Sequence, residues 1–201
     1  MYERYVKRII DVLFAAFALI ILSPAVLIIA IAVIVFMGRP VFYLDRRPGL
    51  REQPFVMFKF RTMRLAGYPS EPDTHRLTKL GCFLRRTSLD ELPQLLNILR
   101  GDMSLVGPRP LLWRYLPYYM PDERARHRVR PGVTGWAQIH GRNEVAIDRR
   151  LKLDVWYVDN LSFCLDMRIL LATCWMVMQR RGVQVDPGAA APNLDVLRSR
   201  S

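Results

Sequence analysis

Two adjacent carboxylates, Asp90 and Glu91, closely follow two basic residues, Arg85 and Arg86. A carboxylate can attack phosphorus and form an acyl phosphate. A neighbouring carboxylate can hold Mg²⁺, which binds one or two carboxylates together with phosphate oxygens. Arginines can neutralise the charge on the transferred phosphoryl group. The segment is therefore a candidate phosphoryl-transfer site; the alternative is that the two carboxylates only cap a helix.

The local pattern places this pair at a helix entrance. Ser88 and Glu91 have the Ser-x-x-Glu spacing of a capping box. The spacing predicts a helix over 89–99 that ends at Gly101, with the carboxylates in a first turn that favours anions. Pro93 conflicts with a regular first turn because it has no N–H to donate. Either the first turn is irregular or the regular helix begins at Pro93.

Several familiar sites are missing from the sequence. It contains no Walker A loop, no GxGxxG, no HExxH, no GxSxG and no Asp-x-Asp. The lack of Asp-x-Asp argues against an ordinary metal-dependent nucleotide-sugar glycosyltransferase and against phosphatases with an Asp-x-Asp nucleophile. The three cysteines have no CxxC spacing, which excludes a disulfide scaffold and a cysteine zinc site.

The chain of 201 residues is strongly basic, with 30 Lys and Arg against 18 Asp and Glu and a net charge of +12. A basic surface favours an anionic partner: nucleic acid, acidic lipid head groups or a phosphorylated substrate. One alternative function is therefore a membrane-anchored basic protein that binds nucleic acid or anionic lipid without catalysis.

The amino-terminal segment is apolar and carries no charge from Val12 to Met37. As a helix these residues would be about 39 Å long, which exceeds the hydrocarbon layer of a bilayer. Basic residues flank both ends, and the positive-inside tendency places both flanks in the cytoplasm. Pro24 removes a backbone donor near the middle, and Ser23 can bond to a carbonyl that this frees. We expect a re-entrant helix broken at Ser23-Pro24; a straight spanning helix is the alternative.

The remaining elements predict a small, mostly helical α+β domain with a short sheet and interfacial helices. Strands are expected at 42–47 and 55–60, and helices at 148–157 and 169–178. The aromatic segment 111–120 is expected in the membrane interface, with packing in the core as the alternative. The alternating arginines from Arg124 to Arg130 predict a solvated basic face. We expect three parts: a membrane helix (1–38), a catalytic domain (39–182) and a loose carboxy-terminal tail (183–201).

Four ordered blocks resemble the bacterial sugar transferase family, the monotopic polyprenol-phosphate phosphoglycosyl transferases, over about residues 4–180. The longest block is residues 85–110, which begins Arg-Arg-Thr-Ser-Leu-Asp-Glu-Leu-Pro-Gln. The other blocks are residues 59–63 (Lys-Phe-Arg-Thr-Met), 130–138 (Arg-Pro-Gly-Val-Thr-Gly-Trp-Ala-Gln) and 153–158 (Leu-Asp-Val-Trp-Tyr-Val). The resemblance also favours the break at Ser23-Pro24.

The resemblance implies a covalent mechanism at the cytoplasmic face of the bacterial inner membrane. Asp90 matches a nucleophile that takes the phosphosugar from a UDP-sugar and releases UMP, and polyprenol (undecaprenyl) phosphate then accepts the phosphosugar. This would be the first membrane step of glycoconjugate assembly, and no nucleic-acid partner is expected. Glu91, with Asp90, matches the Mg²⁺ site. The basic positions near the phosphates are Lys59, Arg61, Arg85 and Arg109, and the candidate nucleotide contacts are Arg142 and Asn143. A related transferase without a covalent step, with Asp90 as base or metal ligand, is the remaining alternative.

Overall fold

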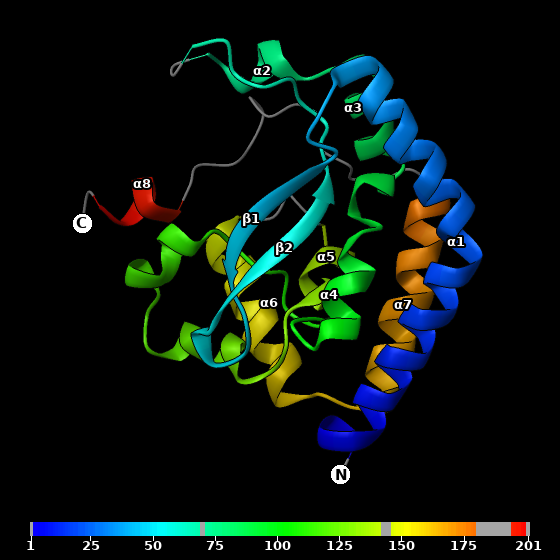
Figure 1. Cartoon of the computed structure of the whole chain (residues 1–201). Helices are drawn as coiled ribbons and strands as arrows, with labels where there is room; N and C mark the ends of the chain where they lie inside the picture. The colour runs from blue at the N-terminus through cyan, green and yellow to red at the C-terminus, as the bar shows by residue number, and fades with distance from the viewer. Residues whose placement is uncertain (1, 69–70, 142–145, 180–193, 200–201) are drawn as a thin grey trace.

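The computed structural model describes residues 2–68, 71–141, 146–179 and 194–199. The described part is mostly helical and contains two small two-stranded sheets (Figure 1). The α+β expectation is confirmed.

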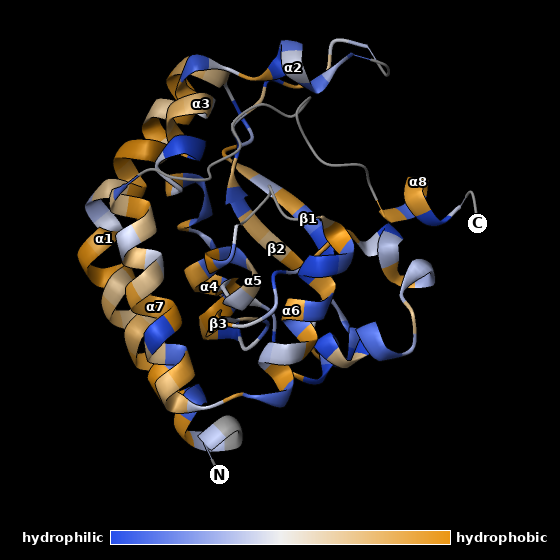
Figure 2. Cartoon of the chain, turned by 180° about the vertical axis from the view of Figure 1, so that it is seen from behind, coloured by the Kyte–Doolittle hydropathy of each residue, from blue (hydrophilic) through white to orange (hydrophobic). Residues whose placement is uncertain are grey.

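A long amino-terminal helix, α1 (Lys7–Met37), runs along one side of the molecule after a short π-helical turn (Tyr2–Val6). Figures 1 and 2 show it beside α7 (Phe163–Met178), and Figure 2 shows that both helices are largely hydrophobic. The helix is not interrupted at Pro24, but Figure 1 shows that α1 bends along its length, so entry and exit of this helix at one membrane face stays a prediction. Ser23 Oγ donates to the carbonyl of Ile20 at 2.8 Å, the group that a residue-24 N–H would otherwise reach.

Both ends of α1 are bonded to the same globular body. Near its start, Lys7 forms a buried ion pair with Asp166 of α7 at 2.6 Å. One turn later, Asp11 accepts from the backbone N–H of Leu105 at 3.0 Å. At its far end, the Arg61 guanidinium donates to the carbonyls of Met37 (2.6 Å) and Gly38. The two bonds from Arg61 satisfy carbonyls at the helix end that have no partner within the helix.

The two sheets differ in pairing. β1 (Phe42–Pro48) and β2 (Pro54–Phe60) form an antiparallel hairpin, which agrees with the predicted strands. β3 (Ser104–Val106) and β4 (Gly132–Thr134) form a short parallel pair. At the end of this pair the two backbone segments lie very close together. A Cβ on Gly107 would lie 2.4 Å from the Arg130 carbonyl oxygen.

Short helices connect and cover these strands. The α-helices are α2 (Asp73–Arg76), α3 (Lys79–Arg86), α4 (Gln94–Arg100), α5 (Trp136–Ile139), α6 (Ile147–Asp159) and α8 (Leu194–Arg198). The 3-10 turns are η2 (Leu50–Glu52), η3 (Leu89–Glu91), η4 (Trp113–Tyr118) and η5 (Asp122–Arg128). The predicted helices at 148–157 and 169–178 lie within α6 and α7.

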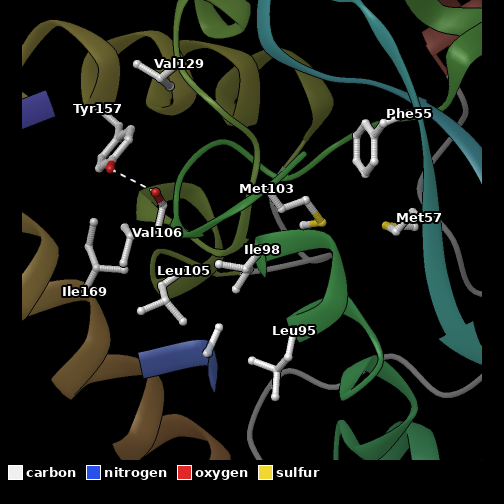
Figure 3. Close-up of a cluster of buried hydrophobic side chains, with 11 residues drawn as sticks. Phe55, Met57, Leu95, Ile98, Met103, Leu105, Val106, Val129, Tyr157 and Ile169 are labelled. Carbon is white, nitrogen blue, oxygen red and sulfur yellow. Dashed lines mark hydrogen bonds between the residues drawn. The ribbon is translucent and has the colours of Figure 1, made fainter. Parts of the chain in front are cut away.

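The main core lies between β2, α4, α7 and the β3–β4 pair (Figure 3). Met57 from β2 and Ile98 from α4 are buried there, and so is Ile169 from α7. The Tyr157 hydroxyl oxygen lies 3.2 Å from the Val106 carbonyl oxygen and donates its hydrogen to Asp166 Oδ1 at 2.7 Å, so its polar atom has a partner inside the core. This core fixes α4, and therefore the η3 turn that precedes it.

A second core differs from the sequence expectation. Tyr115 and Tyr119 are buried there with Leu194, so the 111–120 segment is core rather than an element of the membrane interface. Leu194 begins α8, in the tail that we expected to be loose. Arg198 fastens this helix through a pair of hydrogen bonds to the carboxylate of Glu123 at 2.6 and 2.7 Å.

Candidate active site

The acidic pair lies on an irregular turn between α3 and α4. Ser88 has left-handed backbone angles (φ 56°, ψ 17°) and makes no side-chain cap, so the predicted capping box is wrong. Leu89–Glu91 form a single 3-10 turn, and α4 begins at Gln94 after Pro93. Both alternatives are therefore found in part: residues 89–91 form an irregular turn, and the regular helix begins one residue after Pro93 rather than at residue 89. A regular helix through Pro93 would lack one donor.

Glu91 forms ion pairs with two cations from other parts of the chain. Lys59 Nζ, near the end of β2, lies 2.7 Å from Glu91 Oε1. The Arg109 guanidinium also contacts Glu91, with Nη2 on Oε1 and Nη1 3.4 Å from Oε2. Burial alone would raise the pKa of Glu91, but the charges of Arg109 and Lys59 and their hydrogen bonds lower this pKa well below its usual range. Glu91 is therefore a stable carboxylate.

Asp90 has the opposite environment. Its side chain is buried, and within the described residues it accepts no hydrogen bond and forms no ion pair. Burial and the adjacent charge of Glu91 raise the pKa of Asp90 to about 6, against the opposing charges of Lys59, Arg109 and Arg85. Its oxygens are not occupied by these cations, so Asp90 has the free lone pairs that a nucleophile or a metal ligand needs.

The other predicted phosphate-binding residues divide into two groups. Lys59, Arg85 and Arg109 all lie within electrostatic range of Asp90, and Arg85 Nε also donates to Thr62 Oγ1 at 3.1 Å. Arg61 is instead committed to the end of α1 through the Met37 and Gly38 carbonyls. Arg142 and Asn143 lie outside the described residues. Their predicted phosphate and nucleotide contacts stay predictions.

Sequence reasoning missed two residues behind the site, Arg126 and Asp154. The arginine run was expected to be solvated, but Arg126 is only 3% exposed and forms a 2.7 Å ion pair with the buried Asp154. Arg126 Nη2 also donates to the backbone carbonyl of Arg109 at 2.6 Å. A signal was present in α6: Ile147, Leu151 and Asp154 share one helix face. A carboxylate on an apolar face needs a buried cation.

The capacity of the site for a metal rests on its two carboxylates. In the described ranges, no cluster of three or more His, Cys, Asp or Glu side chains forms a complete metal site. Mg²⁺ does not need one, since it keeps water and binds substrate phosphate oxygens beside one or two carboxylates. The uncommitted carboxylate of Asp90, next to Glu91, fits such an ion.

Comparison with known proteins identifies the family of this chain. The model of the bacterial sugar transferase family matches residues 2–180. The chain is 50% identical over 181 residues to the sugar transferase EpsL of Bacillus subtilis (strain 168), covering 89% of this chain and 90% of that protein. It is 41% identical over 196 residues to the exopolysaccharide production protein ExoY of Rhizobium meliloti (strain 1021), covering 88% and 87%.

A longer relative shares the same region. The UDP-glucose:undecaprenyl-phosphate glucose-1-phosphate transferase of Xanthomonas campestris pv. campestris is 40% identical over 190 residues. The match covers 87% of this chain and 39% of that protein, so the chain spans about two fifths of the length of this relative.

Proposed function

Because this chain belongs to the bacterial sugar transferase family, we propose that it transfers a sugar phosphate from a UDP-sugar to undecaprenyl phosphate through a covalent phosphosugar on Asp90. It is a phosphoglycosyl transferase. The name of the Xanthomonas relative supports the two substrates, and the name of ExoY supports a role in building an extracellular polysaccharide.

The observation that carries the covalent mechanism is the unequal environment of the two carboxylates. Glu91 is clamped by Lys59 and Arg109, whereas Asp90 is buried beside the same cations with its oxygens uncommitted. In the first step an Asp90 oxygen would form a bond to the sugar-bearing phosphorus. The bond from that phosphorus to the bridging oxygen breaks, and UMP leaves with the electron pair. An oxygen of undecaprenyl phosphate then attacks the same phosphorus, and the Asp90 carboxylate is released.

The surrounding groups supply charge stabilisation for both steps. Arg109 and Lys59 hold Glu91, and with Arg85 they place positive charge around Asp90, where a diphosphate would develop negative charge. We propose that Asp90 and Glu91 hold Mg²⁺, which would neutralise phosphate oxygens when bound. Two substrates that use the site in turn never have to be bound together as large anions.

We propose that the enzyme is monotopic at the bacterial inner membrane, with its catalytic domain in the cytoplasm. In the described part of the chain, α1 is the one helix long and apolar enough to cross a membrane. Its ends bond to Asp166 and Arg61, which belong to one packed body, and this supports entry and exit at one face. Tyr2→Cys and Arg39→Cys should therefore both react with a membrane-impermeant thiol reagent from the cytoplasmic side; reaction from opposite sides would show that the helix spans.

The activity is tested by UMP release from a panel of UDP-sugars, with undecaprenyl phosphate and Mg²⁺ present. We expect release with at least one UDP-sugar and formation of the matching lipid-linked phosphosugar. No release from any UDP-sugar, together with salt-sensitive DNA binding, would favour the non-catalytic basic protein instead.

A further inference from the structure

We propose that the buried pair Arg126 and Asp154 is a positioning device that holds Arg109 in place against Glu91. The inference rests on the proposed function, because Glu91 matters for turnover only if the acidic pair is the reaction centre. Neither residue reaches the carboxylates itself, so the pair acts through the backbone of Arg109.

The connection is a continuous series of short contacts. Asp154, on α6, accepts from Arg126 Nη2 at 2.7 Å and from Arg126 Nε at 3.2 Å. The same Nη2 donates to the Arg109 carbonyl at 2.6 Å. The Arg109 side chain then grips Glu91. One guanidinium therefore links α6 to the residue that contacts the acidic pair.

The segment that carries Arg109 depends on such outside donors. Arg109 stands between Pro108 and Pro110, which have no N–H, and residues 107–112 belong to no helix or strand. Three successive carbonyls are each held by a different element. The Pro108 carbonyl accepts from the Gly132 N–H at 3.1 Å, that of Arg109 from Arg126, and that of Pro110 from Arg47 Nη1 at 3.2 Å. Removing the Arg126 donor would release the middle carbonyl, which is that of the functional residue.

Stability alone does not require an ion pair at this buried position. A buried ion pair is expensive to desolvate, and apolar residues of similar volume often replace one at no loss of stability. Arg126 and Asp154 are only 3% and 1% exposed. The planar guanidinium can serve a carboxylate and a carbonyl together, whereas a lysine ammonium is a point charge on a flexible stem. A need to orient Arg109 explains why an arginine occupies this position.

Two variants separate positioning from packing. Arg126→Lys keeps a cation for Asp154 but loses the fork that also reaches the Arg109 carbonyl. The double variant Arg126→Met with Asp154→Leu removes both charges and keeps approximate volume. We expect both to keep a cooperative thermal transition while kcat for UMP release falls at least tenfold, with a smaller change in KM for the UDP-sugar. Arg128→Met, at an exposed position on the same turn, is the matched control and should retain wild-type kcat.

A second readout does not depend on turnover. Hydrogen–deuterium exchange of a peptide covering residues 105–112 should increase in Arg126→Lys, while a peptide from the β1–β2 hairpin exchanges as in the wild type. Folded variants with kcat within twofold of wild type and unchanged exchange at 105–112 would overturn the inference. If the wild type itself releases no UMP, the proposed function fails, and exchange still decides whether Arg126 orders this segment.

Discussion

Two clusters of buried charge in this molecule have opposite organisation. Near the start of α1, Asp166 accepts hydrogen bonds from Lys7 (2.6 Å), from the Tyr2 hydroxyl (2.6 Å) and from the Tyr157 hydroxyl (2.7 Å). At the acidic pair, Glu91 is equally well bonded to two cations, but the neighbouring Asp90 has no such bond in the described part of the chain. The first cluster is complete, and the second contains one uncommitted carboxylate.

The difference separates a carboxylate that stabilises the fold, Asp166, from one that is available for a reaction, Asp90. A buried carboxylate normally has partners that repay its desolvation, as Asp166 does. Among the described residues, Asp90 accepts no hydrogen bond and forms no ion pair, although the cations that hold Glu91 lie beside it. A group kept in this costly state has its oxygens available for an incoming phosphorus or a metal ion. The comparison predicts that substitutions around Asp166 affect stability, whereas substitutions of the acidic pair affect turnover.

Asp90→Asn should have the largest effect on catalysis. We expect UMP release to fall by about 10³-fold or more, since loss of a nucleophile removes the covalent route. The fold should remain intact, because a neutral amide replaces a buried and unpaired charge. The rate of UMP release and the thermal midpoint are measured together. Near-normal turnover in this variant would make Asp90 something other than the nucleophile.

Glu91→Gln should come second, with a loss of about 10²-fold in kcat and a higher Mg²⁺ concentration needed for half-maximal rate. The amide is nearly isosteric, but it carries no charge to hold Lys59 and Arg109 or to bind a cation. A Mg²⁺ titration of UMP release checks both effects. An unchanged rate and unchanged metal dependence would remove Glu91 from the proposed Mg²⁺ site.

Lys7→Met tests the other side of the comparison. It leaves Asp166 buried without its cation, and we expect a destabilisation of about 3 kcal/mol, measured by denaturant unfolding. Formation of the phosphosugar adduct from UDP-sugar alone should stay within about threefold of wild type in the folded enzyme, because Lys7 does not contact the acidic pair. A selective loss of adduct formation without loss of stability would contradict the division between the two clusters.

Lowering the pH should produce the smallest effect, through Asp90 itself. Its pKa is raised to about 6 in the folded protein, so adduct formation should fall as the pH drops through 6 and the carboxylate becomes protonated. A raised carboxylate pKa destabilises the fold above pH 6, and this cost disappears below about pH 4. The stability advantage of Asp90→Asn over the wild type should therefore shrink between pH 7 and pH 4. A constant difference in stability across this range would exclude the raised pKa.

The sequence predicted the components of the site better than their connections. The resemblance identified Asp90, Glu91, Lys59 and Arg109, which the structure brings together. Local spacing misassigned the role of Glu91 as a cap, because its partners Lys59 and Arg109 lie 32 and 18 residues away along the chain. Ser88 gave no local sign of its left-handed backbone.

Two further outcomes depend on side-chain partners. At Pro24 the expected Ser23 bond is present, since its hydroxyl donates to the carbonyl that the proline leaves free, and the helix bends without an interruption. The alternating arginines suggested an exposed face, although one of them, Arg126, is buried with Asp154. In each case a partner decided the outcome, and periodicity alone does not identify partners.

The most direct test is the mass of the enzyme after incubation with a UDP-sugar that it turns over, without undecaprenyl phosphate, followed by rapid quenching. We expect an added phosphosugar on the peptide that contains Asp90, together with released UMP, and loss of the added mass when undecaprenyl phosphate is supplied. An enzyme that turns over normally with both substrates, yet never carries this mass and releases UMP only when the lipid phosphate is present, would contradict the covalent mechanism.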